Sequence, residues 1–394
     1  MPAGYICAKT ENVTRRGERT MKEMKELLAF VLLIVFVSAC AVQVGYYLFV
    51  YIRFAFHKKK SVHQETQPVS VIVCARNEVN NLRKYIHSLL EQAYPVFEVI
   101  VVNDCSWDES GIFLEELQKK YNHLKVVTIQ EQEKYRHAKK FALTLGIKAA
   151  KHDILVFSDA DCMPESKNWL ADMQGNFGKG TEIVLGYGPY RREKGFLNKM
   201  IRFDTFLIAV QYFSFTLAGM PYMGVGRNLA YRKSLFFSTK GFARHYHLLS
   251  GDDDLFVNEN ATSANTKIEV QPDSFTYSDP KKTFGEWFRQ KTRHIGTGRY
   301  YKGKHKFLLF LNSFSGILFF ASLIALLALS YDWRIVLSLY LVKILIEMPI
   351  LYISSKKLQE TDLVWIFPIL EFFNTLLQPV FFFSNLVTKQ KPWK

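Results

Sequence analysis

The chain has 394 residues, which is enough for one or two domains with a sizeable core. Its 51 Lys and Arg against 36 Asp and Glu give a formal net charge of +15, which is compatible with anionic lipid, nucleic acid or a phosphorylated substrate. Many of the 33 Phe residues lie in long apolar runs, which favours a membrane over nucleic acid, and the five widely separated cysteines show no CxxC or His-Cys metal spacing.

A transmembrane helix is predicted near the start of the chain. The basic residues 1–26 precede an uncharged apolar run at 27–52, which is longer than a bilayer crossing requires. Tyrosines at one end of this run and the sequence HKKK at 57–60 are typical of a membrane boundary. The run is too long for a cleaved signal peptide, and no small-residue cleavage site follows it. Because both flanks are basic, charge does not orient the helix, although a start at Met21 would remove four of the N-terminal charges.

Residues 61–300 are predicted to form an α/β domain. Strand-like runs alternate with helical segments, an order that indicates a mostly parallel sheet with flanking helices. The strand-like runs lie at 69–75, 97–104, 124–130 and 153–161, and the helical segments at 80–92, 110–121 and 136–150. Polar residues collect where the runs end, and the carboxyl ends of parallel strands form the binding crevice of such sheets. No GxGxxG or Walker loop follows the first run, so neither a dinucleotide site nor a P-loop is indicated.

Two further segments of this domain combine apolar and charged residues. The sequence FGEWFRQKTRH at 284–294 has the pattern of a helix lying in the membrane interface. The segment 195–228 is too charged at its start to span a bilayer and too apolar for a loop. It is therefore expected to be an interfacial helix or to line a channel for an acceptor substrate.

Residues 307–387 are predicted to be a C-terminal membrane region of two to three helices, followed by a basic tail at 388–394. Its apolar segments lie at about 307–330, 335–353 and 363–387. In the second segment, Lys343 and Glu347 are spaced to pair on one helix face. Pro368, Glu371 and Pro379 interrupt the third segment, which is therefore expected to kink, re-enter or lie in the interface.

Five motifs in order resemble those of family 2 glycosyltransferases, the inverting enzymes with a GT-A fold. They are VSVIVCARNEVNNLRKYIHSLLEQ, VIVVNDCSWDES, AKKFALTLGIKAAKHDILVFSDAD, GDDDLF and QKTRH. The resemblance covers roughly residues 68–300, and the layout is similar to that of membrane-bound polysaccharide synthases with fewer helices. It implies a GT-A-like sheet with flanking helices, a nucleotide-sugar donor with a UDP-sugar favoured, and a lipid-linked or saccharide acceptor.

The resemblance also implies a donor site along the strand ends. Asp161 matches the family's ligand for a divalent metal, Mg²⁺ or Mn²⁺, which neutralises the leaving diphosphate. Asp159 matches a contact to the donor's ribose or sugar, Asp104 the base-binding aspartate, and Lys139 a lysine at the diphosphate or base. The remaining predicted donor-binding residues are Ala75, Asn77, Glu78, Gln290 and Arg293. The plainer alternatives are an acidic turn capping the next helix for the two aspartates, and a solvated helix lysine for Lys139.

Inverting transfer also needs a base on the acceptor side of the sugar. Asp252 in GDDDLF matches the family's catalytic base, and Asp253 takes its place if the register shifts by one residue. His294 stands where the family's QxxRW element has Trp, which argues against a processive polymerase. A plain turn is the alternative for the glycines near residue 226. The predicted acceptor-side residues are Asp254, His294, Gly226 and Asn228.

We therefore expect an integral membrane, metal-dependent family 2 glycosyltransferase of the hexosyltransferase type. Its catalytic domain is expected in the cytosol, at the inner or plasma membrane, because nucleotide sugars are made there and the cysteines show no disulfide pattern. Its expected partners are the donor, the acceptor and membrane lipid, and not nucleic acid. Two alternatives remain: a nucleotidyltransferase, which would release pyrophosphate, and a non-catalytic membrane scaffold, which would not bind the donor.

Overall fold

A computed structural model describes residues 3–58, 65–130 and 139–387 of the chain. The chain divides into two compact units. The helical unit comprises Met1–Phe49 and Leu308–Pro349, and the sheet unit comprises Val50–Phe307 and Ile350–Lys394. The predicted basic tail, residues 388–394, lies outside the described residues.

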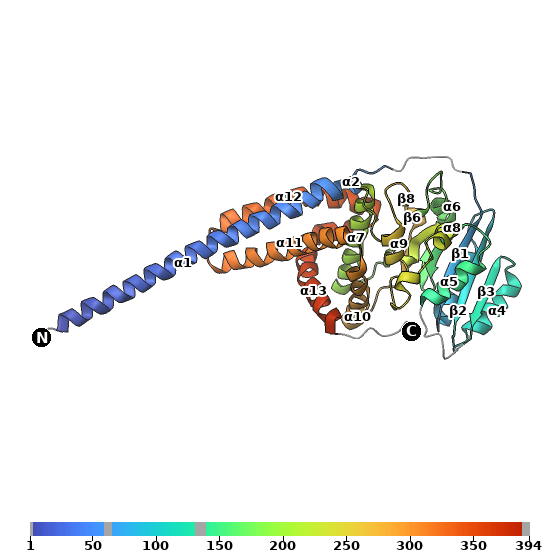
Figure 1. Ribbon diagram of the computed structural model, residues 1–394, viewed down its shortest axis with the longest axis horizontal. Coiled ribbons are helices and arrows are strands. Elements are labelled where there is room, and N and C mark those ends of the chain that lie inside the picture. Colours follow the sequence, from blue (N-terminus) through green and yellow to red (C-terminus); the bar gives the residue numbers. More distant parts are fainter. Residues whose placement is uncertain (1–2, 59–64, 131–138, 388–394) are drawn as a thin grey trace. The chain divides into compact units, whose positions relative to one another are not determined.

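The described residues of the sheet unit build a seven-stranded sheet with the order β3-β2-β1-β4-β7-β6-β8 (Figure 1). In this order β1 to β4 pair in parallel, whereas β7 runs antiparallel to both β4 and β6. A separate antiparallel pair is formed by β5 and β9. The mostly parallel sheet predicted from the sequence is confirmed. The strands are β1 (Val69–Ala75), β2 (Phe97–Asp104), β3 (Leu124–Ile129), β4 (Ile154–Asp159), β5 (Cys162–Pro164), β6 (Ile183–Leu185), β7 (Leu229–Arg232), β8 (Thr266–Ile268) and β9 (Thr276–Ser278).

Helices cover both faces of the parallel part of the sheet, which is why its strands are nearly continuous apolar runs. Val71, Val73 and Val99 pack with the apolar faces of α3, α4 and α6 in one core cluster. The alternate strand residues, such as Ile72, point to the opposite face, where α5 packs against β1 and β2. These helices are α3 (Val79–Leu90), α4 (Ser110–Lys120), α5 (Lys139–Ala149) and α6 (Trp169–Gln174), and shorter elements in the rest of the sheet unit include η2 (Gly226–Asn228), α8 (Lys233–Ser238), η3 (Ala243–His245), α9 (Asp254–Asn260), η4 (Pro272–Ser274) and η5 (Gly296–Tyr300).

Three longer helices complete the sheet unit: α7 (Phe196–Leu217), α10 (Phe284–Ile295) and α13 (Phe367–Val387), the last preceded by η6 (Thr361–Ile366). A capping box between Thr283 and Glu286 starts α10. The Trp287 and Phe288 rings of α10 pack against Phe381 of α13, and Trp287 is only 2% exposed. The apolar side of α10 is therefore largely covered by protein, because α13 supplies a partner that the local sequence does not reveal.

The helical unit contains all of α1 (Ala3–Tyr46) and most of α11 (Gly303–Ala328) and α12 (Trp333–Lys357). The helix α1 begins well before residue 27, because the polar segment after Pro2 contains no further proline. It continues through a π-helical turn at Tyr47–Tyr51 into α2 (Ile52–Ala55). The predicted Lys343–Glu347 pair forms inside the unit, with Nζ 2.7 Å from Oε2.

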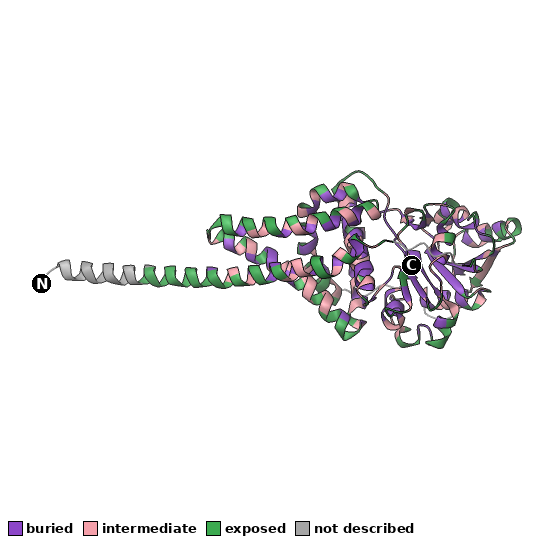
Figure 2. Ribbon diagram, turned by 90° about the horizontal axis from the view of Figure 1, so that it is seen from above, coloured by how far each residue is buried: buried purple, intermediate pink, exposed green. Residues whose placement is uncertain are grey.

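Four helices among the described residues are long and apolar enough to cross a membrane: Arg19–Ala55, Gly303–Ala328, Trp333–Lys357 and Thr361–Val387. Figure 2 shows buried residues concentrated in the strands, whereas exposed residues are prominent along the described part of the helix that starts near the N-terminus. Large apolar side chains of the four helices are exposed, such as Phe30 at 59% and Leu345 at 72%. A lipid environment explains such exposure in a way that water does not.

Candidate active site

The loops that follow β1 and β2 are joined at the carboxyl edge of the sheet. Asn77 and Cys105 both adopt left-handed backbone conformations, with φ of 55° and 50°. The Asn77 backbone N–H donates to Ser106 Oγ, and Trp107 N–H donates to Asn77 Oδ1, each over 3.0 Å. Asn77 therefore fixes the shape of this edge through its backbone and its side chain.

Arg76 lies beside Asp104 at this edge, with Nη1 4.0 Å from Oδ2. The two side chains are 12% and 4% exposed. Among the described residues, Arg76 Nε and Nη1 have no hydrogen-bond partner, which fits the binding of a further acceptor group. The sequence placed Arg76 at a strand end but gave it no role. The sequence did contain a clue to its role: Arg76 follows the strand β1, which pairs with β2, and β2 ends in the predicted base-binding residue Asp104.

Ala75 and Glu78, two other predicted donor residues, lie at the end of β1 and just before α3. Ala75 is fully buried at the end of β1, opposite Asn103 of β2. Glu78 is the residue before α3, where its carbonyl accepts from Leu82 N–H and its carboxylate accepts from Asn81 Nδ2. Both residues therefore shape the edge of the sheet.

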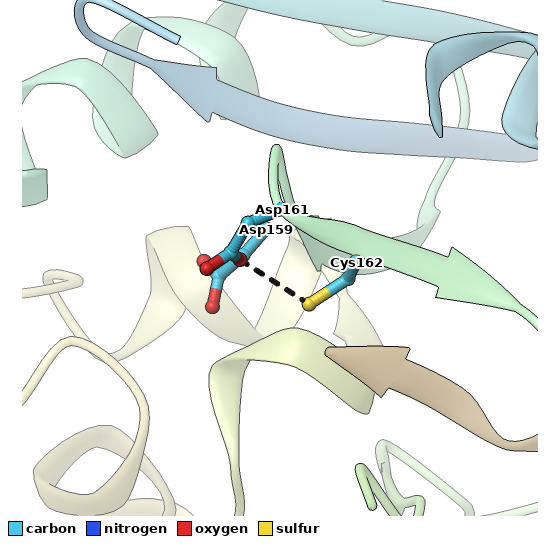
Figure 3. Close-up of side chains that lie close together, drawn as sticks. All are labelled: Asp159, Asp161 and Cys162. Carbon is cyan, nitrogen blue, oxygen red and sulfur yellow. Dashed lines mark hydrogen bonds between the residues drawn. The ribbon is translucent and has the colours of Figure 1, made fainter. Parts of the chain in front are cut away.

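The two aspartates of the DAD sequence lie next to each other, Asp159 as the last residue of β4 and Asp161 just beyond it (Figure 3). One ligand atom each from Asp159, Asp161 and Cys162 falls within 4.8 Å of the others. Burial, together with the two carboxylates, raises the pKa of the Cys162 thiol well above its ordinary value. The thiol contacts Asp161 Oδ1 and Ser278 Oγ. The remaining donor set is a pair of carboxylates, which fits a hard divalent cation such as Mg²⁺ or Mn²⁺.

Lys139, the first residue of α5, links two groups of carboxylates. Its Nζ lies 2.7 Å from Asp159 Oδ1 and 3.4 Å from Asp252 Oδ2. Burial opposes the charge on this lysine, but the two carboxylates outweigh it and raise the pKa of Lys139 well above its ordinary value. Burial likewise opposes ionisation of Asp159, yet Lys139 holds the pKa of that carboxyl below its usual value. One cavity is lined by Cys74, Lys139, Leu143, Phe157, Ser158, Asp159, Gly226, Leu229, Tyr231, Asp252 and Asp253.

The three aspartates at 252–254 lie in different surroundings. Asp252 lines the cavity and contacts Lys139. Asp253 caps α9, and its carboxylate accepts from Asp254 N–H over 2.8 Å and from Gly226 N–H over 2.7 Å. Burial and the neighbouring carboxylates of Asp252 and Asp254 raise the pKa of Asp253 to about 7.

Asp254 accepts hydrogen bonds from Thr297 Oγ1 and from the Tyr301 hydroxyl, the latter over 2.7 Å. Its other oxygen accepts from Leu255 N–H. These contacts place Asp254 in a buried network between α9 and η5 rather than on the cavity.

Gly226 and Asn228, the other predicted acceptor-side residues, lie on η2. A side chain at Gly226 would place its first carbon 3.2 Å from Asp253 Oδ2, so glycine permits the close approach of that carboxylate. Asn228 is fully buried, and its amide donates to the carbonyls of Tyr187 and Ser274 while accepting from Trp169 Nε1. Asn228 thus holds the turn that presents Gly226.

The QKTRH residues lie on α10 next to a cation that sequence reasoning missed. Gln290 Nε2 donates to the Tyr190 hydroxyl over 3.0 Å, and the Arg227 guanidinium lies 4.5 Å from the centre of the Tyr190 ring. Arg293 and His294 are exposed neighbours, with Nη2 and Nε2 separated by 3.4 Å. Arg227 and Arg293 both favour the ionised form of Asp159. A cation inside a Gly-x-Asn turn was the signal that could have identified Arg227.

Comparison with known proteins matches the chain to glycosyltransferases. The family described as glycosyl transferase family 2 matches residues 70–245, and the one described as glycosyl transferase family group 2 matches residues 169–377. The chain is 27% identical over 248 residues to the probable glycosyltransferase YdaM of Bacillus subtilis, covering 60% of this chain and 56% of that protein. It is 28% identical over 240 residues to glycosyltransferase AglE of Haloferax volcanii, covering 59% of this chain and 72% of that protein.

A solved structure supports the same fold. The mannosyltransferase PcManGT from Pyrobaculum calidifontis, solved in complex with GDP-Man and Mn²⁺, superposes with a TM-score of 0.59 at 18% identity, covering 89% of this chain and 99% of that one. The second family match extends over more than half of the chain, from α6 into α13. The chain therefore belongs to glycosyltransferase family 2.

Proposed function

We propose that this protein transfers a sugar, with inversion, from a nucleoside-diphospho-sugar to a lipid-linked or polysaccharide acceptor at the cytosolic face of a membrane. One observation carries the proposal: Lys139 Nζ contacts both Asp159 and Asp252, and all three residues line the same cavity. This arrangement provides one carboxylate group for the donor and another for the acceptor, at a spacing that a single lysine side chain bridges.

Asp161 and Asp159 would hold the divalent cation on the donor side, which neutralises charge on the leaving diphosphate. Mn²⁺ accompanies GDP-Man in PcManGT, which supports a metal here without identifying it. Lys139, Arg227 and Arg293 supply further positive charge to the diphosphate. These cations lower the free energy of the diphosphate more as its charge increases during departure.

The Arg76–Asp104 pair is proposed to bind the nucleobase. Arg76 offers hydrogen-bond donors and Asp104 offers a carboxylate acceptor. A uracil or guanine edge presents the complementary set, namely carbonyl acceptors beside a ring N–H. A UDP-sugar remains our favoured donor, and a GDP-sugar is the alternative that this pair also fits.

Asp252 is proposed to be the catalytic base. It accepts the proton of the acceptor hydroxyl as that oxygen bonds to the anomeric carbon and the bond from this carbon to the diphosphate breaks. Asp253 cannot turn freely toward the acceptor, because both of its oxygens accept from backbone N–H groups. Four membrane-type helices among the described residues support an acceptor that is itself held at the membrane.

Two variants of the detergent-solubilised full-length protein test this proposal. UDP- and GDP-sugars are supplied with Mn²⁺ and a lipid extract, and the released nucleoside diphosphate is measured. Asp161→Ala should abolish turnover and weaken nucleotide binding, and chelation should have the same effect. Asp252→Asn should lower transfer about a hundredfold to ten-thousandfold while nucleotide binding stays near the wild-type value.

Glu116→Ala, an exposed carboxylate substitution on α4, is the matched control and should leave both measurements unchanged. Normal transfer by chelated wild-type protein would show that the metal assignment is wrong. If no donor yields nucleoside diphosphate, the catalytic proposal fails and a non-catalytic scaffold becomes the better account.

A further inference from the structure

Lys140 is a buried lysine to which the proposed transfer assigns no role. It follows Lys139 in the first turn of α5 and is 1% exposed. Burying an ammonium group costs free energy unless its N–H donors all find acceptors. The partners of Lys140 therefore indicate what this side chain does.

All the partners of Lys140 Nζ are backbone carbonyls of one segment. The distances are 2.6 Å to His245 O, 3.2 Å to Leu248 O and 2.7 Å to Ser250 O. An ammonium group has three N–H donors, so these three acceptors satisfy it completely. A neutral Lys140 amine has only two N–H donors and would turn its nitrogen lone pair toward the third carbonyl. The three carbonyl contacts therefore match the charged ammonium form of Lys140. No ion pair of Lys140 occurs within residues 3–58, 65–130 and 139–387.

The segment held by Lys140 leads directly into the proposed catalytic base. Ser250 is followed by Gly251, whose φ is +89°, and then by Asp252. At its other end the segment is fastened to α9, where His245 Nε2 lies 3.0 Å from Glu259 Oε1. The path of residues 245–250 is thus fixed from α9 and from α5.

The neighbouring lysine makes this attachment relevant to chemistry. Lys139 contacts both Asp159 and Asp252, while Lys140 holds the backbone that carries Asp252. Two consecutive residues of α5 therefore contact the donor-side carboxylate and the acceptor-side segment. A shift of this segment would change the separation between the two carboxylate groups.

We infer that Lys140 is a positioning residue, whose ammonium group fixes the backbone of residues 245–250 and thereby sets the place of Asp252 relative to the donor. The inference rests on the proposed function for its catalytic consequence. The attachment itself does not, because it is a property of the free protein. If Lys140 only stabilised the fold, its loss would loosen the sheet unit as a whole.

Lys140→Met tests this directly, because Met keeps much of the side-chain volume and removes every N–H donor. The matched control is Lys148→Met, which makes the same change at an exposed position of the same helix. Hydrogen–deuterium exchange is measured on the full-length protein in detergent, together with UDP and GDP binding in the presence of Mn²⁺ and the transfer rate.

For Lys140→Met we expect amide exchange in residues 245–252 to rise about tenfold, as removal of charge-assisted hydrogen bonds implies. Exchange in β1 and α3 should stay at the wild-type rate, and nucleotide affinity should change less than about twofold, because neither depends on this segment. The transfer rate should fall at least about tenfold through kcat, with little change in the KM for the donor. Lys148→Met should match the wild type throughout.

Lys140→Gln is the milder second variant, since it keeps two N–H donors on a shorter side chain. It should give intermediate exchange and transfer, and it replaces the Met variant if that protein does not fold. Unchanged exchange at 245–252 in both variants overturns the inference. A uniform rise in amide exchange that includes β1 also overturns the inference, because it would mean that Lys140 only stabilises the fold. If the wild type transfers no sugar, the proposed function fails, whereas the exchange and nucleotide-binding results still decide whether Lys140 holds this segment.

Discussion

The residues Asp252, Asp253 and Asp254 are chemically identical, yet the fold gives each a different surrounding. Asp252 faces Lys139, Asp253 accepts from backbone N–H groups, and Asp254 is held by Thr297 and Tyr301. The cause is local: α9 starts at Asp254, so successive side chains point in different directions from its first turn. The sequence of three consecutive aspartates does not reveal these different surroundings, because they depend on where α9 starts.

The raised pKa of Asp253 predicts a pH-dependent stability. In the folded protein this group titrates near pH 7, against 3.8 for an ordinary aspartate. Its contribution to stability is therefore complete below about pH 3.8, and it is lost as the pH rises through about 7. Asp252→Asn removes one of the charges that oppose ionisation of Asp253. The melting temperature of the variant, relative to wild type, should be about 1 to 3 °C higher at pH 8 than at pH 5.5.

Thermal unfolding of the two proteins in the same detergent at both pH values measures this difference. Comparing the two pH values removes the constant effect of losing the Lys139–Asp252 contact. Glu116→Gln should show no such dependence, since Glu116 is exposed on α4. An equal difference at pH 5.5 and pH 8 would mean that Asp252 does not act on Asp253.

The sequence pattern pointed to the carboxylates of the candidate site and to two of its cations, Lys139 and Arg293, but not to Arg227. Asp159 and Asp161 lie at the strand end where the pattern predicted them, because an apolar run followed by carboxylates identifies such an edge. Arg227 escaped prediction because its position depends on Tyr190, a residue 37 positions away in the sequence that stacks with it only after folding.

At the scale of elements, the parallel strands were the most predictable part of the fold. The runs predicted at 69–75 and 97–104 coincide with β1 and β2. The strands β6, β7 and β8 are only three or four residues long, which is too short for a periodic pattern. The segment at 195–228 was ambiguous because α7 is apolar on most sides, and the structure shows why: it is buried within the sheet unit.

The turn before α9 predicts an element-scale effect of a single methyl group. Gly251 has a φ of +89°, and a side-chain carbon there would lie 2.5 Å from Leu255 Cδ1. Gly251→Ala should therefore strain the backbone by roughly 1 to 3 kcal/mol and displace Asp252. We expect a lower melting temperature and a transfer rate reduced by about tenfold or more, with nucleotide binding retained.

Gly298→Ala in η5 is the matched control, because no atom lies within 4 Å of its added carbon and its φ is not positive. This variant should behave like the wild type in unfolding and in transfer. A Gly251→Ala protein with wild-type transfer would mean that the path of the chain into Asp252 is not critical.

At the scale of the whole molecule, the open question is which side of the membrane the catalytic domain occupies. The charges on both flanks of the first apolar run predict no orientation, whereas the charges around α11 and α12 do predict one. Lys302, Lys304 and Lys306 lie at the start of α11, and Lys356 and Lys357 end α12. Between these two groups of lysines, the connection from α11 to α12 has one charged residue, Asp332, and the first turn of α12 adds Arg334. The positive-inside rule then predicts that the start of α11 and the end of α12 face the cytosol.

Cysteine labelling tests this orientation in a bacterial inner membrane. In a Cys7→Ser, Cys105→Ser background, the remaining cysteines Cys40, Cys74 and Cys162 are buried. One reporter is Ile112→Cys, which replaces a 65% exposed side chain on α4, and the other is Ser330→Cys, in the exposed connection between α11 and α12. A membrane-impermeant maleimide should label the Ser330 reporter in intact spheroplasts. It should label the Ile112 reporter only in inverted vesicles or after lysis, because the sheet unit must meet cytosolic nucleotide sugars. The opposite pattern would place the catalytic domain outside the cytosol and would exclude a cytosolic donor, whereas labelling of both reporters from one side would mean that α11 and α12 do not span the membrane as a pair.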